Sequence, residues 1–229
     1  MKRNNKTESM TTAALELNLE PSDQTAMMPD AQPVGGEIDE EQVYRASAYS
    51  LLAALLRASP DRGLLDHLCQ LSPVTDGDND DLLLAMSTLA LSARNHREEE
   101  IKDEYHNLFI GLGKGEVVPY ASWYLTGFMM EQPLSDLRDD LRALGFERNA
   151  DIHEPEDHAA ALCEVVSIMI NDNAGLPRQK KFFETHMQAW IGRFFEDLAS
   201  ANSAVFYKSV ARFGAAFIEL EQTYFSMQS

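Results

Sequence analysis

The sequence predicts an all-α fold, a single globular domain built as a helical bundle and preceded by a tail. Apolar residues recur at three- and four-residue spacing through most of the chain after Ile38, which is the pattern of amphipathic helices. No segment shows the sustained alternation that is typical of a strand, and regular repeats of roughly 20–50 residues are absent, which argues against a solenoid. We therefore divide the chain into a flexible acidic tail over residues 1–37 and a helical domain over residues 38–229.

The expected tail is polar and shows little periodicity. Prolines and glycines interrupt it at Pro21, Pro29, Pro33, Gly35 and Gly36. Such segments bury too little apolar surface to offset the entropy lost on ordering. A short helix near residues 12–19 is the one element that we expect there, and we assign the tail no function.

Helix boundaries follow from charged residues, glycine and proline. Asp39, Glu40 and Glu41 stand where a helix N-terminus favours negative charge, and Gly145 suits the position just after a helix. Pro155 suits the first position of a helix, because its missing N–H would have no partner there. The expected helices run from Ile38 to shortly before Pro60 and then over residues 64–71, 80–93, 98–110, 133–144, 155–170, 177–199 and 203–227, with a short helix through Trp123 and Tyr124.

The charge balance limits the classes of partner. Lys and Arg total 19 against 37 Asp and Glu, a formal net charge of -18. A negative field of this size repels phosphate backbones, so we expect no nucleic-acid binding. It attracts basic partners, such as a peptide that carries arginines, although acidity that only maintains solubility is the simpler interpretation.

Cysteine usage and hydropathy indicate a cytoplasmic protein. Cys69 and Cys163 belong to no CxxC or Cys/His cluster, so neither a disulfide framework nor a structural metal is expected. The N-terminus lacks the apolar run of a signal peptide, and no stretch approaches the roughly 18 apolar residues of a membrane span. We expect no membrane insertion.

The first candidate binding segment is an aromatic loop between helices. It contains Gly111, Gly113 and Gly115 and continues as Pro119-Tyr120-Ala121-Ser122-Trp123-Tyr124. An irregular segment with crowded aromatic rings can form a partly exposed apolar groove that presents a few hydroxyl groups. Packing the junction between helices is the alternative role for Phe109, Trp123 and Tyr124. For Tyr120, Ser122 and Trp123 taken together, binding is the better interpretation.

The second candidate segment is Glu154-Pro155-Glu156-Asp157-His158. With Pro155 at the first helical position, the next three residues fall in the first turn. There the helix dipole disfavours charge on the His158 imidazole, whereas Asp157 favours it. A plain helix cap is the alternative. A metal site would need His153 and Glu154 to fold back beside Asp157 and His158, and we give it little weight.

Two other hypotheses stay open. A small nucleotide-dependent or hydrolytic enzyme would use the Gly111–Gly115 loop with Asp157 and His158. That loop lacks the GxxxxGK[ST] spacing of a phosphate loop. A triad of Ser122, His158 and Asp157 is also disfavoured, because adjacent side chains on a helix point about 100° apart. A purely structural adaptor would instead bury Tyr120 and Trp123.

The two segments occur in a specific order and spacing. Glu104-Tyr105, Leu108-Phe109 and Gly111 precede the Pro119–Tyr124 segment, and the Glu154–His158 segment follows. This arrangement resembles the TorD/DmsD/NarJ family of redox-enzyme maturation chaperones. The resemblance extends to Phe183, His186, Trp190 and Phe206-Tyr207 and covers about residues 43–225. Leu112-Gly113 departs from the Gly-Pro that many relatives have in this loop, which affects its expected conformation.

The resemblance implies a TorD-like chaperone and not an enzyme. Such a protein binds the twin-arginine signal peptide and the apo-form of a molybdoenzyme catalytic subunit, assists insertion of the molybdopterin cofactor and delays export until maturation is complete. The peptide-binding residues carried over by position are Phe109, Pro119, Tyr120, Ser122, Trp123 and Tyr124 along the groove, with Glu156, Asp157 and His158 at its polar end.

The resemblance also bears on cofactors, clients and assembly. It implies no resident cofactor, with weak contact to GTP or to molybdopterin guanine dinucleotide as the exception. Trimethylamine-oxide reductase, dimethyl-sulfoxide reductase, nitrate reductase and formate dehydrogenase are all open as clients. A monomer and a homodimer are both open, the latter with or without domain swapping.

Overall fold

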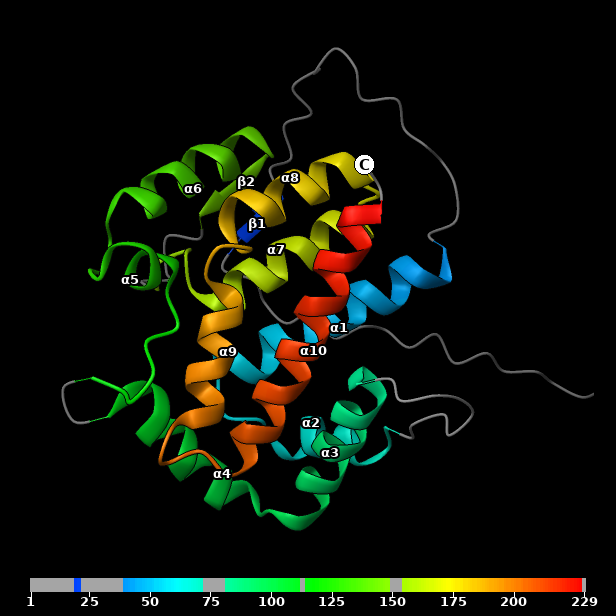
Figure 1. The fold of residues 1–229 in the computed structure, drawn as a ribbon, viewed down its shortest axis with the longest axis vertical. Coiled ribbons are helices and arrows are strands. Elements are labelled where there is room, and N and C mark those ends of the chain that lie inside the picture. The colour runs from blue at the N-terminus through cyan, green and yellow to red at the C-terminus, as the bar shows by residue number, and fades with distance from the viewer. Residues whose placement is uncertain (1–18, 22–38, 72–80, 112–113, 149–153, 228–229) are drawn as a thin grey trace, which may run out of the picture.

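Helices make up most of the chain that the structure describes, as the sequence predicts (Figure 1). The structure is a computed structural model, and it describes residues 19–21, 39–71, 81–111, 114–148 and 154–227. The helices are α1 (Glu40–Arg57), α2 (Arg62–Cys69), α3 (Asp81–Asn95), α4 (Glu98–Tyr105), η1 (His106–Ile110), α5 (Ala121–Thr126), α6 (Gln132–Ala143), α7 (Ala159–Asn171), α8 (Leu176–His186), α9 (Ile191–Ser200) and α10 (Phe206–Met227). None of these helices is both long enough and apolar enough to cross a bilayer.

Several helix ends lie where the sequence predicts them. Asp39 caps α1 by accepting a hydrogen bond from the N–H of Gln42 at 2.8 Å. Gly145 follows α6 with φ of 86°, a left-handed conformation that glycine adopts without strain. The expected helix at residues 12–19 falls mostly outside the described residues, and so does most of the expected tail.

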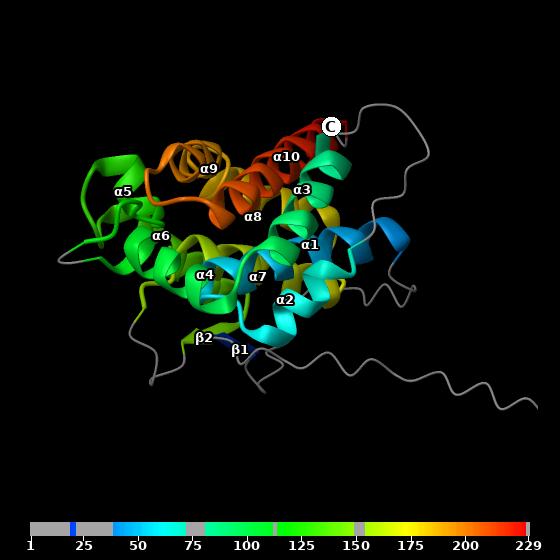
Figure 2. The same ribbon diagram turned by 90° about the horizontal axis from the view of Figure 1, so that it is seen from below.

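The core lies around two central helices, α1 and α7, which pack side by side (Figure 1). Helix α7 is buried along almost its whole length. Helix α10 packs against α9, α3, α1 and α4, and Figure 2 shows α9 and α10 together on one side of the central pair. Large aromatic side chains fill the space between these layers, among them Trp190, Tyr49, Tyr207, Phe183 and Phe194.

A short strand pair is the element that the sequence did not predict. Strand β1 (Leu19–Pro21) pairs antiparallel with β2 (Phe146–Arg148), and Glu20 lies opposite Glu147 in the register. Three residues are too few to show an alternating pattern, so periodicity could not reveal these strands. The pair lies at the outer edge of the helical bundle and leaves the all-α class unchanged (Figure 2).

The single helix predicted over residues 177–199 is wrong, because α8 and α9 are separate. In a continuous helix the carbonyl of His186 would accept the backbone N–H of Trp190. Instead it accepts the indole Nε1–H of Trp190 at 2.7 Å, while the Trp190 backbone N–H donates to Met187. The buried indole thus replaces the helical bond. No proline or glycine marks the break, so the sequence pattern gives no sign of it.

A buried ion pair ties α1 to α10. The guanidinium of Arg45 donates to both carboxylate oxygens of Glu221, each at 2.7 Å, and Tyr49 donates to the same carboxylate at 3.0 Å. Arg45 also donates to Gln179 in α8 at 2.8 Å. Each buried charge therefore has several partners, which is the condition for burying an ion pair without a large penalty.

The N-terminus of α10 is capped from another helix. Glu104 in α4 accepts the backbone N–H groups of Val205 at 2.8 Å, Phe206 at 3.0 Å and Tyr207 at 2.7 Å. These N–H groups have no partner within α10, and a carboxylate also stabilises the positive end of the helix dipole. Glu104 therefore fixes α4 against the start of α10.

Replacing Glu104 should destabilise the fold. Glu104→Ala leaves three N–H groups without their acceptor, so we expect the free energy of unfolding to fall by about 3 kcal/mol. Asp103→Ala, at the exposed neighbouring position, should change it by less than about 0.5 kcal/mol. Urea denaturation followed by circular dichroism measures both, and equal effects would contradict the capping role.

The two glycines of α9 and α10 should respond oppositely to the same substitution. A Cβ at Gly214 would come within 2.2 Å of the Phe195 ring, so Gly214→Ala should cost about 1–3 kcal/mol of stability through overpacking. A Cβ at Gly192 meets nothing within 4 Å, and Gly192→Ala should add about 0.5–1 kcal/mol, because alanine favours the helix. Thermal unfolding of both variants distinguishes the signs.

Candidate binding site

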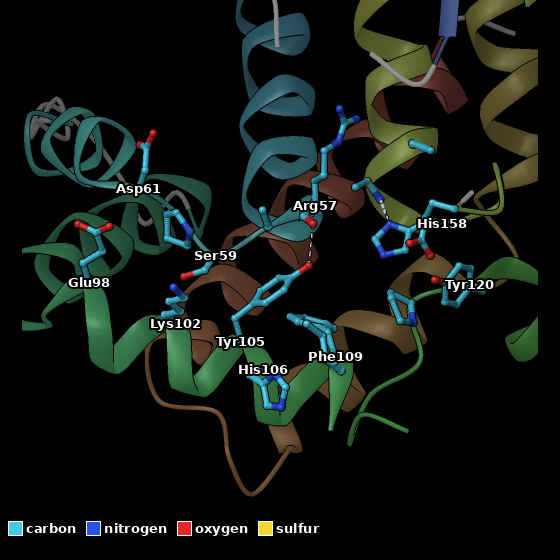
Figure 3. A pocket seen from close by; sticks show the side chains of 17 residues that line it. Arg57, Ser59, Asp61, Glu98, Lys102, Tyr105, His106, Phe109, Tyr120 and His158 are labelled. Carbon is cyan, nitrogen blue, oxygen red and sulfur yellow. Dashed lines mark hydrogen bonds between the residues drawn. The ribbon is translucent and has the colours of Figure 1, made fainter. Parts of the chain in front are cut away.

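A cavity of about 750 Å³ opens between the end of α1, α4 with η1, and the start of α7 (Figure 3). The segment from Arg57 to Asp61 forms one wall, and Tyr120 and His158 form the opposite wall (Figure 3), while Pro119 also lines the cavity. Its size lies within the range of about 300–1,000 Å³ that is typical of ligand sites.

An aromatic cluster forms the floor of the cavity. The Tyr105 and Phe109 rings lie 5.0 Å apart, and Tyr207 from α10 lies 5.4 Å from Phe109. The Tyr105 hydroxyl donates to the backbone carbonyl of Arg57 at 2.7 Å, which fixes the ring against the end of α1 (Figure 3). Burial, and to a lesser degree Glu154, raise the pKa of Tyr105 to about 12, so this hydroxyl stays protonated.

A π-helical turn presents this floor to the cavity. The sequence predicts one α-helix to Ile110, but residues 106–110 form the π-helix η1. Gly111 ends it with φ of 58°, and its N–H donates to the carbonyl of His106 at 2.7 Å. The wider turn changes the direction in which Phe109 and Ile110 point, and such turns are frequent at functional sites. Ile110 is 54% exposed although it lines the cavity.

Charged residues surround the aromatic floor. Asp61 and Glu98 lie at the end of the cavity beside Lys102, and Arg57 lies above Tyr105 (Figure 3). Glu154 also lines the cavity and interacts electrostatically with Tyr105. Burial first, and then the nearby Asp157, raise the pKa of Glu154. The cavity therefore combines an apolar floor with the lining carboxylates of Asp61, Glu98 and Glu154 and the cations of Arg57 and Lys102.

Backbone pairing joins the two sequence segments. Tyr120 and His158 form an antiparallel bridge. In it the Ala121 N–H donates to the backbone carbonyl of Asp157 at 3.0 Å, and the Ala159 N–H donates to the backbone carbonyl of Pro119 at 2.8 Å. The prediction that α7 begins at Pro155 is wrong for this reason. The pairing holds His158 extended, with φ of -66° and ψ of 138°, so the helix starts only at Ala159.

His158 is the N-cap of α7 and a wall of the cavity. Its Nδ1 accepts the N–H of Ala160 at 3.0 Å, and its ring meets that of Tyr120 edge to face at 5.0 Å (Figure 3). Burial first, and then the Arg57 charge, lower the pKa of His158 to about 3. The imidazole is therefore neutral at physiological pH, and Asp157 does not restore its charge.

Ser122 and Asp157 form a buried joint instead of a groove wall. Asp157 Oδ2 accepts the backbone N–H of Ser122 at 2.8 Å and also its hydroxyl. Ser122 is fully buried, and Asp157 is 1% exposed. Asp157 thus holds the first turn of α5, while its other oxygen has no hydrogen-bond partner among the described residues. It borders a smaller cavity of about 160 Å³ between α5, α6 and α8.

Glu156 also points inward. It accepts from Arg138 of α6 at 2.8–2.9 Å and is 6% exposed. We expected Glu156, Asp157 and His158 at the polar end of a groove, but of these three only His158 lines the large cavity.

Trp123 and Tyr124 face a different cavity, of about 230 Å³, beside α9. The Tyr124 ring lies 5.4 Å from the Trp190 ring, and its hydroxyl donates to Asp197 at 2.8 Å. The structure therefore brings Phe109, Pro119, Tyr120 and His158 together but separates them from Trp123 and Tyr124.

The residues of the enzyme and metal hypotheses are arranged differently from what those sites need. Asp157 bonds Ser122 directly instead of standing behind the His158 imidazole, which is where a triad places its carboxylate. Within the described ranges no three His, Cys, Asp or Glu side chains lie close enough to hold a metal ion. His153 and Leu112-Gly113 fall outside those ranges.

Comparison with known proteins identifies the family. Residues 75–196, more than half of the chain, match the model of the nitrate reductase delta subunit family. The chain belongs to this family.

Individual proteins match the chain over a longer range. The chaperone protein TorD of Vibrio parahaemolyticus is 26% identical over 165 residues, which cover 65% of this chain and 77% of that protein. TorD of Vibrio atlanticus is 26% identical over 201 residues, 79% of this chain and 94% of that protein. A crystal structure described as a redox enzyme maturation protein from Archaeoglobus fulgidus has a TM-score of 0.52 at 16% identity, covering 82% of this chain and 99% of that one. The last comparison shows a shared fold.

The sequence pattern does not identify all of the residues that line the large cavity. The wall from Arg57 to Asp61, and also Glu98 and Lys102, stood in no recognised segment. Ala58-Ser59-Pro60 marks the end of a helix, but nothing local shows that this turn faces Tyr120. Only the pairing of distant helices places it there.

The neutral state of His158 predicts a stability change with pH. The pKa is about 3 in the folded state and about 6.5 in an unfolded chain, so between these values the unfolded state binds more protons. Stability is therefore complete above the unfolded pKa and falls as the pH drops. From pH 7 to pH 5, urea denaturation should show wild type losing about 2 kcal/mol more than His158→Asn, which keeps a capping oxygen.

His67→Asn is the matched control, because it removes a histidine at an exposed position of α2. If His158→Asn and His67→Asn show the same pH dependence, burial does not keep His158 neutral.

Proposed function

We propose that this protein is a cytoplasmic chaperone that binds the twin-arginine signal peptide and the apo-form of a molybdoenzyme. Binding would hold the enzyme subunit while its molybdopterin cofactor is inserted and would delay export until then. The observation that carries the proposal is the large cavity, which has an aromatic floor and three carboxylates in its lining.

The chemistry of that cavity suits a signal peptide. Such a peptide joins paired arginines to an apolar run. Tyr105, Phe109 and Ile110 offer apolar surface to the run, and the carboxylates of Asp61, Glu98 and Glu154 line the same cavity. Carboxylates bind guanidinium groups with charge-assisted hydrogen bonds. The net charge of -18 adds a long-range attraction for a basic peptide.

The comparisons support a chaperone over the alternatives. Relatives that share most of their length with this chain are named chaperones. The enzyme hypothesis needs Asp157 beside His158, but Asp157 is bonded to Ser122. The adaptor hypothesis expects Tyr120 and Trp123 to be buried, whereas both are partly exposed.

Substitutions at the rim of the large cavity should weaken peptide binding without unfolding the protein. The probe is a synthetic peptide with two adjacent arginines and a following apolar run, titrated by calorimetry. Ile110→Glu places a charge against the apolar run, and Glu154→Gln removes an anion, so each should raise the Kd about tenfold. Binding should also weaken as salt increases, because charge attraction is screened.

Two exposed positions outside the cavity provide matched controls. Val205→Glu repeats the apolar-to-acid change at a residue that is 60% exposed, and Glu131→Gln repeats the loss of charge in front of α6. Neither should alter the Kd more than twofold or so. Equal Kd values for wild type, Ile110→Glu and Glu154→Gln would overturn this cavity as the peptide site. Failure to capture any molybdoenzyme subunit from native cytoplasm would overturn the chaperone role itself.

A further inference from the structure

The cavity beside α9 contains an aromatic face, two carboxylates and one cation of the chain itself. It lies between the segment from Lys114 to Val118, the start of α5 and the end of α9, and has a volume of about 230 Å³. Trp123 is partly exposed there, and Glu116 and Asp197 are both exposed. This cavity shares no lining residue with the large cavity.

Lys114 occupies the aromatic face. Its ammonium nitrogen lies 4.7 Å from the centre of the Trp123 ring, which is the geometry of a cation–π contact. Lys114 is exposed and is the only cation among the described residues that line this cavity. An exposed lysine is held weakly by such a contact and exchanges readily with water.

Neutral groups hold the two carboxylates in place. Glu116 accepts the backbone N–H groups of Ser203, at 3.0 Å, and of Asn202. Asp197 accepts the Tyr124 hydroxyl at 2.8 Å. A carboxylate has about four acceptor positions, so each keeps room for another donor. The N–H groups of Ser203 and Asn202 also lower the pKa of Glu116, which keeps it ionised.

We propose that this cavity binds an arginine side chain of a protein partner, and that Lys114 occupies the same place until the partner displaces it. The guanidinium is planar, so it stacks on the Trp123 ring while its N–H groups reach a carboxylate. An ammonium is a compact, strongly hydrated charge that cannot stack on the ring or bind a carboxylate through a planar pair of N–H groups. Arginine therefore competes well against Lys114 for the Trp123 ring. A cation that binds the ring more weakly than Lys114 does not displace it. This site does not depend on peptide binding in the large cavity.

The Trp123 indole reports occupancy directly. The chain has two tryptophans, and the buried Trp190 indole, bonded to His186, serves as an internal reference. The probe is N-acetyl-arginine amide, and N-acetyl-citrulline amide is its uncharged analogue of the same shape. Titration at constant ionic strength, followed by the two indole N–H signals in NMR, should move the Trp123 signal with the arginine probe only.

Substitutions of Lys114 should change the affinity in opposite directions. Lys114→Gln removes the competing cation, so the probe should bind about fivefold more tightly than to wild type. Lys114→Arg places a better competitor on the ring and should weaken binding about threefold. Lys208→Gln, an exposed lysine of α10, controls for the change in net charge and should leave the affinity as in wild type.

The outcomes are decisive in both directions. The ordered series of Lys114→Gln, wild type and Lys114→Arg supports displacement at Trp123. Equal affinities across the series, an equal response to citrulline, or no movement of the Trp123 signal would overturn it. Ile110→Glu should leave the probe's effect unchanged, so failure here and failure of peptide binding in the large cavity are distinguishable.

Discussion

The backbone pairing of Tyr120 with His158 is the constraint on which the rest of the site depends. Two reciprocal hydrogen bonds, from Ala121 to Asp157 and from Ala159 to Pro119, join segments that are almost forty positions apart. The Asp157 carboxylate strengthens the joint, because it accepts two hydrogen bonds from the buried Ser122. The start of α5 and the start of α7 are therefore fixed relative to each other, and the cavity walls with them.

Because the joined residues are extended, neighbours in the sequence point in opposite directions. Asp157 points into the joint and His158 toward the large cavity, whereas both would lie on one turn if a helix began at Pro155. Tyr120 is also extended and lines the large cavity, whereas Ser122 lies in the first turn of α5 and is buried. The Pro119–Tyr124 segment therefore contributes Tyr120 to the large cavity, Trp123 to the cavity beside α9, and Ser122 to the buried contact with Asp157. Its residues cannot all be assigned to one groove.

This explains which parts of the molecule the sequence predicts well. The helical class, the acidic start of α1 and the glycine turn after α6 depend on local patterns, and all three are confirmed. The separation of α8 from α9 depends on where the Trp190 indole finds a carbonyl, and the start of α7 depends on a partner strand. Both are tertiary effects that no local pattern encodes. The wall beside Arg57 is missed for the same reason, since a helix distant in sequence supplies it.

Helix α4 contributes both to the stability of the fold and to the candidate binding site. Glu104 faces inward and caps α10, while the next residue, Tyr105, faces the cavity and bonds to the end of α1. The aromatic floor is consequently held from three helices, and its rings lose little further freedom when a ligand covers them. Pre-organisation of this kind raises affinity because less ordering remains to be done on binding. The peptide binding that we propose would gain most from it, since an extended, flexible peptide already loses its own entropy on binding. The rigid joint at Tyr120 and the buried cap at Glu104 therefore belong to the binding site as much as the residues that line it.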